Sequence, residues 1–238
     1  MDQPKDPIAS LGNIVTVWAH PDDETYLAGG LMAMARAQGA HVTCVVATDG
    51  DFADSPADRR SRGRLRLCEL HSALDVLDVH DREFIHLPDG GCSHVDDNGP
   101  VDAIAQVLAS RAPDTVITFG PDGFTGHGDH RAVSRWTIAA ARRAVPASRI
   151  LHPTTTATRL VEDRDIVDHH PIFDDGLPVT HGPDTLALAL ELPEHWLDKK
   201  VRALRCHDSQ TRWLIESIGI VRYRRWVAAE HFVNAAPY

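Results

Sequence analysis

The chain has 238 residues, enough for one α/β domain with a sizeable buried core. Its formal net charge of -10 disfavours a nucleic-acid backbone or an anionic membrane as the main partner. The polar residues 1–7 lack the apolar core of a signal peptide, and no apolar stretch is long enough to span a bilayer. The four cysteines are far apart and form no Cys-x-x-Cys pair, so we expect reduced thiols. These features predict a cytoplasmic protein that binds neither membranes nor nucleic acid.

Short apolar runs alternate with helical patterns through the first half of the chain. The run at 14–19, Ile-Val-Thr-Val-Trp-Ala, is typical of a buried parallel strand. Leucines recur at helical spacing from Leu67 to Leu77, and Gly39 follows an alanine- and methionine-rich segment as a helix stop. The elements predicted in this half are strand 14–19, a helix to about 38, strand 41–47, a helix around 67–77, strand 83–87 and helix 101–110.

The second half continues this pattern after an interruption. Residues 145–184 are rich in Pro, Asp, Thr and His, and we interpret them as an irregular insertion or flap. The elements predicted around it are strand 115–119, helix 129–143, strand 186–192, helix 194–206 and a final strand near 226–233. Alternating strands and helices predict a Rossmann-like α/β fold with a doubly wound, mostly parallel sheet in three α/β/α layers. We expect residues 1–238 to form one domain.

Dense polar clusters follow two of the predicted strands. The turn at 20–24, His-Pro-Asp-Asp-Glu, comes directly after the first strand, and His-Gly-Asp-His at 127–130 follows the strand at 115–119. Sites in open α/β sheets form at the carboxyl ends of strands, so we expect the two clusters to meet. Imidazoles and carboxylates without a nearby thiolate suit Zn²⁺, and three protein ligands leave a position for water.

The two clusters divide naturally between metal binding and chemistry. His20 and Asp23 can reach one ion from a tight turn, while Asp22 points elsewhere and can accept a proton from water. His127 and His130 lie three residues apart at a helix start, so one can bind metal while the other faces the substrate. Either cluster alone is more often a helix-capping turn or a polar loop. Because both clusters lie at predicted strand ends, a metal site is the favoured interpretation.

Six short motifs occur in order along nearly the whole chain. They are A-H-P-D-D-E at 19–24, R-x-x-E at 66–69, P-D-G at 88–90, G-H-x-D-H at 126–130, H-x-S-Q at 207–210 and E-x-F at 230–232. The set resembles the LmbE-like (PIG-L) zinc N-deacetylases, which remove acetyl groups from compounds of N-acetylglucosamine type. Known substrates of that family include precursors of mycothiol, bacillithiol and glycosylphosphatidylinositol.

Carried over residue by residue, the resemblance implies a division of roles. The implied roles are metal ligand for His20, Asp23 and His130, general base for Asp22, oxyanion stabiliser or acid toward the leaving amine for His127, tuning of that histidine for Asp129, and substrate contact for Arg66 and Asp89. Two positions depart from the family pattern. Thr125 stands where some members have a tyrosine that helps to hold the oxyanion, and Gly128 replaces the usual proline.

The resemblance implies a zinc-dependent hydrolase acting on a small N-acetylated sugar or sugar conjugate. Asp22 would take a proton from a water whose pKa zinc lowers to about 7, and His127 would help to offset charge on the carbonyl oxygen. The alternatives are an amidase for a larger conjugate and a non-catalytic metal- or sugar-binding protein. A dinucleotide site is disfavoured, because the first turn lacks G-x-G-x-x-G and is crowded with carboxylates. Substrate identity stays open, as does the oligomeric state, with a homo-oligomer as one option.

Overall fold

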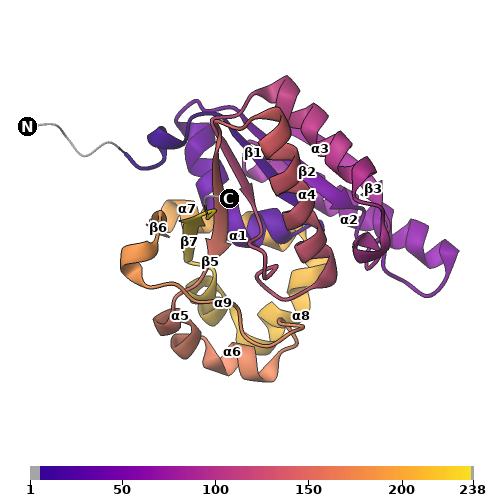
Figure 1. Ribbon diagram of the computed structural model, residues 1–238. Coiled ribbons are helices and arrows are strands. Elements are labelled where there is room, and N and C mark those ends of the chain that lie inside the picture. The colour runs from indigo at the N-terminus through magenta and orange to yellow at the C-terminus, as the bar shows by residue number, and fades with distance from the viewer. Residues whose placement is uncertain (1–5, 237–238) are drawn as a thin grey trace, which may run out of the picture.

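A seven-stranded sheet forms the centre of the protein (Figure 1), which a computed structural model describes over residues 6–236. The strands are β1 (Ile14–Trp18), β2 (Val42–Thr48), β3 (Asp81–Leu87), β4 (Thr115–Thr118), β5 (Arg149–Thr154), β6 (Leu188–Glu191) and β7 (Ala229–Asn234). Their order across the sheet is β3-β2-β1-β4-β5-β7-β6. Strands β1 to β5 are parallel, whereas β7 pairs antiparallel with both β5 and β6. The signal-peptide expectation rests largely on residues 1–5, which lie outside the described range.

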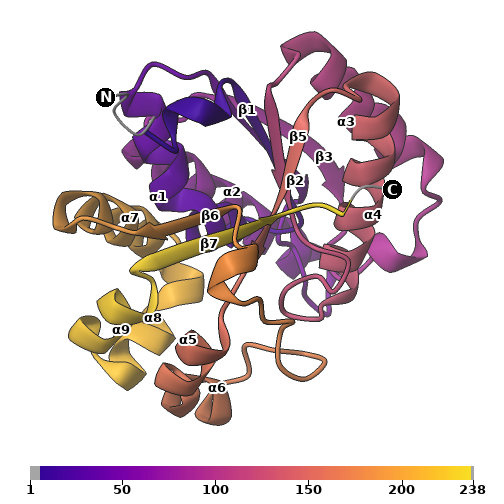
Figure 2. The ribbon, with the colours of Figure 1, turned by 60° about the vertical axis from the view of Figure 1, so that its left-hand side comes forward.

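Helices cover both faces of the sheet. They are α1 (Asp23–Ala37), α2 (Pro56–Val76), α3 (Asn98–Arg111), α4 (Gly128–Ala144), α5 (Ala157–Glu162), α6 (Arg164–His169), α7 (Glu194–Cys206), α8 (Asp208–Ile218) and α9 (Ile220–Trp226), with short 3₁₀ turns at Ala9–Leu11, Cys92–His94 and Pro183–Thr185. Figure 2 shows α1 and α7 on one side of the sheet and α3 and α4 on the other. The short helices α5, α6, α8 and α9 gather at one end. Within residues 6–236, no helix is both long and apolar enough to cross a membrane.

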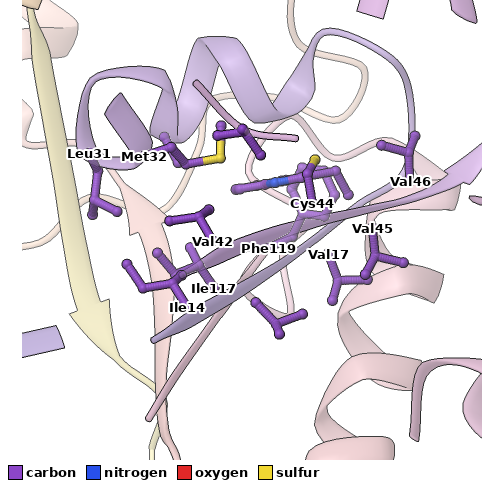
Figure 3. Packing of buried hydrophobic residues seen from close by; sticks show 14 of the residues in the cluster. Ile14, Val17, Leu31, Met32, Val42, Cys44, Val45, Val46, Ile117 and Phe119 are labelled. Atoms are coloured by element: carbon purple, nitrogen blue, oxygen red, sulfur yellow. The ribbon is translucent and has the colours of Figure 1, made fainter. Parts of the chain in front are cut away.

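The central strands are apolar on both sides because helices cover both faces. Every residue of β1 and β2 is buried. Figure 3 shows their side chains packed with those of β4 and with Leu31 and Met32 of α1. Continuous apolar strands of this kind are required in a parallel sheet between two helical layers. The α/β, mostly parallel, doubly wound sheet predicted from the sequence is therefore confirmed.

The neighbouring strands β1 and β4 mark a reversal in the winding of the chain. After β1 the chain passes into α1 on one face, and after β4 it passes into α4 on the other. Such a reversal leaves a crevice at the carboxyl ends of the two strands. The turn at 20–24 directly follows β1, and the loop at 119–127 joins β4 to α4. Both polar clusters therefore lie at this crevice.

Three segments differ from the sequence-based expectation. Residues 145–184, expected to be irregular, contain β5 and the helices α5 and α6. The sequence of β5, Arg-Ile-Leu-His-Pro-Thr, includes a proline that disfavours a strand, and the strand is held by its neighbours β4 and β7. The last strand begins at Ala229 rather than near 226, because α9 occupies the preceding residues. The strand expected at 186–192 is the shorter β6.

Candidate active site

Two strand ends bring the three predicted metal ligands together. Nδ1 of His20 lies 3.1 Å from Nε2 of His130 and 3.6 Å from Oδ2 of Asp23. The remaining separation, from Nε2 of His130 to Oδ1 of Asp23, is 3.4 Å. His20 and Asp23 belong to the turn after β1, whereas His130 lies in the first turn of α4. All three residues are buried.

Contacts on the outer sides of both imidazoles hold the rings in place. Nε2 of His20 lies 3.2 Å from Oδ2 of Asp129 and 3.0 Å from Oδ1 of Asp89. Nδ1 of His130 donates to the carbonyl oxygen of Gly123 at 2.9 Å. The inner nitrogens, Nδ1 of His20 and Nε2 of His130, are therefore left facing each other. Metal-binding histidines are held in this way, because their second nitrogen usually donates to a carboxylate or a carbonyl.

Without a cation between them, the two facing nitrogens compete for one proton. Burial lowers the pKa of His130 to about 4. Burial also lowers the pKa of His20, but hydrogen bonds to Asp129, Asp23 and Asp89 outweigh it and raise that pKa well above its ordinary value. Burial tends to raise the pKa of Asp23, yet the imidazoles of His130 and His20 hold it below the usual range. A divalent cation bound here would take the place of the shared proton.

The spacing and charge of the cluster fit such a cation. Tetrahedral Zn²⁺ with bonds of about 2.0–2.1 Å places its ligand atoms about 3.3 Å apart, and the separations above are 3.1, 3.4 and 3.6 Å. Two overlapping groups, His20/His127/His130 and His20/Asp89/Asp129, also have ligand atoms within 4.8 Å of one another. Arg66 brings a permanent positive charge to the surrounding carboxylates, which are Asp22, Asp23, Glu24, Asp89 and Asp129. Buried negative charge in excess is unfavourable unless a cation offsets it.

Asp22 lies beside the cluster in a strained backbone conformation. Its φ of 122° falls in a region that residues other than glycine rarely adopt. Oδ2 of Asp22 lies 3.1 Å from Nη2 of Arg66, so the carboxylate faces the guanidinium. Burial raises the pKa of Asp22 to about 6, although Arg66 acts in the opposite direction. A carboxylate in this position, with a pKa close to neutrality, can accept a proton.

A fully buried pair, Glu24 and His207, holds the backbone of Asp22. Oε2 of Glu24 accepts the N–H of Asp22 at 2.9 Å, and Oε1 lies 3.0 Å from Nε2 of His207. Both side chains are 0% exposed. Burial lowers the pKa of His207, but Glu24 outweighs it and the pKa rises above its ordinary value. Sequence reasoning placed both residues in motifs but did not pair them, since their partnership is visible only in space.

His127 occupies the N-cap of α4 on the more exposed side of the cluster. Its Nδ1 accepts the backbone N–H of Asp129 at 3.1 Å, which leaves the proton on Nε2. Its side chain is 33% exposed, and Nε2 lies 4.0 Å from Oδ2 of Asp174. The ring centroid is 4.8 Å from that of His20. His127 is therefore placed to donate a hydrogen bond to a group bound next to the ligands.

Asp129 connects His20 to the loop at 88–92. Its Oδ2 accepts the N–H of Gly90 at 2.8 Å, and its Oδ1 accepts the N–H of Cys92 at 3.0 Å. The same carboxylate faces His20. The resemblance assigns to Asp129 the tuning of His127, but in the structure the contact with His127 is made by the backbone N–H of Asp129.

The two predicted substrate contacts, Arg66 and Asp89, are directed toward the site itself. Arg66 is 6% exposed, and besides facing Asp22 it donates to the carbonyl oxygen of Pro21. Asp89 has one oxygen 3.0 Å from His20 and the other 3.7 Å from Arg66. Both side chains therefore contact, and help to hold, the turn at 20–24.

Comparison with protein families matches residues 15–141 to PIG-L, described as GlcNAc-PI de-N-acetylase. The chain is 31% identical over 240 residues to 1D-myo-inositol 2-acetamido-2-deoxy-alpha-D-glucopyranoside deacetylase of Corynebacterium glutamicum, an alignment that covers 87% of this chain and 77% of that protein.

Solved structures share the fold at low sequence identity. N,N'-diacetylchitobiose deacetylase from Pyrococcus horikoshii matches with a TM-score of 0.66 and 17% identity, over 97% of this chain and 86% of that one. GalB, the 4-carboxy-2-hydroxymuconate hydratase of Pseudomonas putida, matches with a TM-score of 0.66 and 18% identity, over 95% and 97%. These two activities differ, so the fold alone does not decide the reaction. The family match and the Corynebacterium relative do decide the family: this chain belongs to the PIG-L (LmbE-like) family.

Proposed function

We propose that this chain is a zinc-dependent hydrolase that removes the acetyl group from an N-acetylated sugar or sugar conjugate of N-acetylglucosamine type. The observation that carries the proposal is the pair of imidazole nitrogens facing each other at 3.1 Å, with the carboxylate of Asp23 beside them and Asp22 held apart. The deacetylase of Corynebacterium glutamicum, to which the chain is similar, supports the substrate class. The products would be acetate and a free amine.

His20, Asp23 and His130 would hold the zinc ion. Two imidazoles and one carboxylate form a donor set that zinc favours, and three protein ligands are typical of its catalytic sites. When bound, zinc lowers the pKa of water and polarises a carbonyl group. The outer contacts of His20 and His130 support this assignment, because they orient both rings without using the inner nitrogens.

Asp22 would accept the proton of the attacking water. Its carboxylate stands outside the ligand set, so it is free for this task. We assign to Arg66 the orientation of that carboxylate, and to Glu24 the hold on the Asp22 backbone. Correct orientation of a catalytic group matters greatly, because a displacement of about 1 Å can lower the rate by about 10²-fold.

His127 would donate from Nε2 to the carbonyl oxygen or to the departing amine. Thr125, which replaces the tyrosine of some family members, has its hydroxyl oxygen 3.0 Å from Nδ1 of His130. That hydroxyl therefore faces a proposed ligand, which leaves His127 as the donor for this task. Asp89 stays a predicted substrate contact beside the turn.

The proposal is tested by measuring acetate release from N-acetylglucosamine and its conjugates. Zinc-loaded protein should release acetate, a chelator should stop the release and added zinc should restore it. Asp22→Asn should keep its zinc and lose about 10²–10⁴-fold in kcat. The matched control is Asp102→Asn, since Asp102 is 60% exposed and pairs with Arg143. Zinc-loaded protein that releases no acetate from any of these compounds would overturn the proposed deacetylation.

A further inference from the structure

A cavity of about 320 Å³ lies beside Asp22 and Asp23 and is lined in part by residues of α5, α6 and α9. Figure 1 shows these three helices at one end of the molecule. This volume lies at the lower end of the range for small-molecule sites. The wall is mainly apolar, and its large apolar side chains include Tyr26, Leu160, Val167, Ile172, Phe173 and Trp226. The cavity therefore continues from the reacting centre into an apolar compartment.

The charged side chains deeper in this wall are already bonded within the protein. Arg159 donates to two backbone carbonyl oxygens at the end of α9, at 3.0 and 3.2 Å. Asp163 accepts a hydrogen bond from Arg222 at 2.9 Å. Glu230 accepts two backbone N–H groups of α1, at 2.7 and 2.8 Å. A sugar ring placed against these three side chains would find them already paired, whereas an apolar group needs no hydrogen-bond partner there.

The cavity is lined by Asp22 and Asp23 but not by His127. His127, as the structure describes it, stands off this wall with its Nε2 toward Asp174. This step rests on the proposed function and takes the second of the two roles given there to His127, donation to the departing amine. The sugar amine then lies toward His127, and the acyl group extends toward the cavity, whose wall does not include His127.

We infer that this cavity is an acyl subsite, and that the enzyme hydrolyses N-acyl glucosamines with apolar acyl chains of about four to eight carbons in preference to N-acetylglucosamine. The reaction is unchanged in kind. Water adds its oxygen to the carbonyl carbon, the C–N bond breaks, and the products are a carboxylic acid and the amine. A longer chain buries apolar surface against the wall, which stabilises the transition state together with the bound substrate.

A chain-length series tests this inference. The kcat/KM values of N-acetyl-, N-butanoyl-, N-hexanoyl- and N-octanoylglucosamine should rise about fourfold per methylene until the cavity is full. A flat or falling series, with N-acetylglucosamine still hydrolysed, would overturn the acyl subsite and leave the proposed function standing. A rise that occurs only with alkyl glycosides of N-acetylglucosamine would also overturn it, because the apolar group would then lie on the sugar side.

Binding separates failure of the subsite from failure of the chemistry. Titration calorimetry of zinc-loaded Asp22→Asn with the same series should show affinity rising with chain length. If no compound is hydrolysed by the wild type but affinity rises, the subsite stands and the proposed function falls. Affinity that does not depend on chain length would overturn the subsite whatever the turnover.

Two matched variants test whether the preference for longer acyl chains arises from this cavity. Val167→Phe, which fills part of the space, should lower the octanoyl-to-acetyl ratio of kcat/KM about tenfold, the equivalent of nearly two methylene contacts. Val161→Phe makes the same change on α5 at a residue that is 73% exposed, and should leave the ratio as in the wild type. Equal ratios in the two variants would contradict the assignment of this cavity.

Discussion

Replacing Glu24 tests the support of the catalytic turn. Glu24→Ala removes three contacts at once: the pairing with His207, the hydrogen bond that Oε2 accepts from the N–H of Asp22 and the one that Oε1 accepts from the hydroxyl of Thr25. Glu24→Gln removes only the charge, because an amide oxygen can still accept that N–H. Comparing the two variants therefore separates the effect of the ion pair with His207 from the effect of the hydrogen bond to the strained Asp22 backbone.

The size of the effect follows from complete burial. Breaking a buried pair by removing one partner destabilises a protein by about 3–5 kcal/mol. The lower end applies to Glu24→Ala, since the imidazole of His207, which is 0% exposed, can lose its proton at neutral pH. A loss of about 3 kcal/mol lowers the Tm of a protein of this length by about 6–12 °C. Release of the Asp22 backbone should lower kcat by about 10²-fold.

Both quantities are measured below the Tm of the variants, by thermal unfolding and by acetate release. Glu24→Ala should lose stability and kcat, whereas Glu24→Gln should lose less stability and keep most of its kcat. Glu216→Gln, an exposed change on α8, serves as the control. A kcat of Glu24→Ala within about twofold of the wild type would refute the claim that Glu24 positions Asp22.

Three further outcomes are expected. His130→Ala should keep its fold and lose bound zinc, and elemental analysis showing a full complement would remove His130 from the ligand set. His127→Ala should lower kcat by about 10²–10³-fold, whereas Thr125→Val should leave it nearly unchanged because that hydroxyl contacts His130; equal losses in the two variants would contradict this division. Burial lowers the pKa of His207, but Glu24 outweighs burial and raises this pKa above its ordinary value. The stability that protonated His207 adds should therefore be complete below about pH 6.5 and lost as pH rises through the raised pKa. The free energy of unfolding in urea should show this loss in the wild type and not in His207→Gln.

The sequence predicts the polar turn that follows β1, whereas it misses the strand β5. The turn after β1 can be predicted because a wholly buried strand ends there in a run of polar residues. Such a change from apolar to polar residues is expected where a strand ends at a crevice. β5 has no such contrast, since Arg149 and Pro153 argue against a strand. Its place is set by its partners, with Leu151 beside Ile117 of β4 and Pro153 beside Phe232 of β7. Pairing of this kind is tertiary and leaves no local pattern.

The contacts of the motif residues divide in the same way. His20, Asp22 and Asp23 are neighbours in one turn, so their proximity can be predicted from their order in the sequence. The placement of Asp129 against His20 could not be deduced, because it depends on the loop at 88–92 that donates to its carboxylate. Nor could the link between Glu24 and His207, since it joins α1 to the junction of α7 and α8.

The cavity wall is assembled over a longer range of the sequence than the turn at 20–24. Tyr26, Ile172 and Trp226 come from three distant segments, yet together they line one cavity. Trp213, which is 46% exposed, lines the same cavity. Apart from Asp22 and Asp23, the residues that line the cavity lie outside the turn at 20–24, so most of the wall can vary independently of the turn. Substitutions in the turn should therefore change kcat for all substrates alike, whereas substitutions in the cavity wall should change the ratio between substrates.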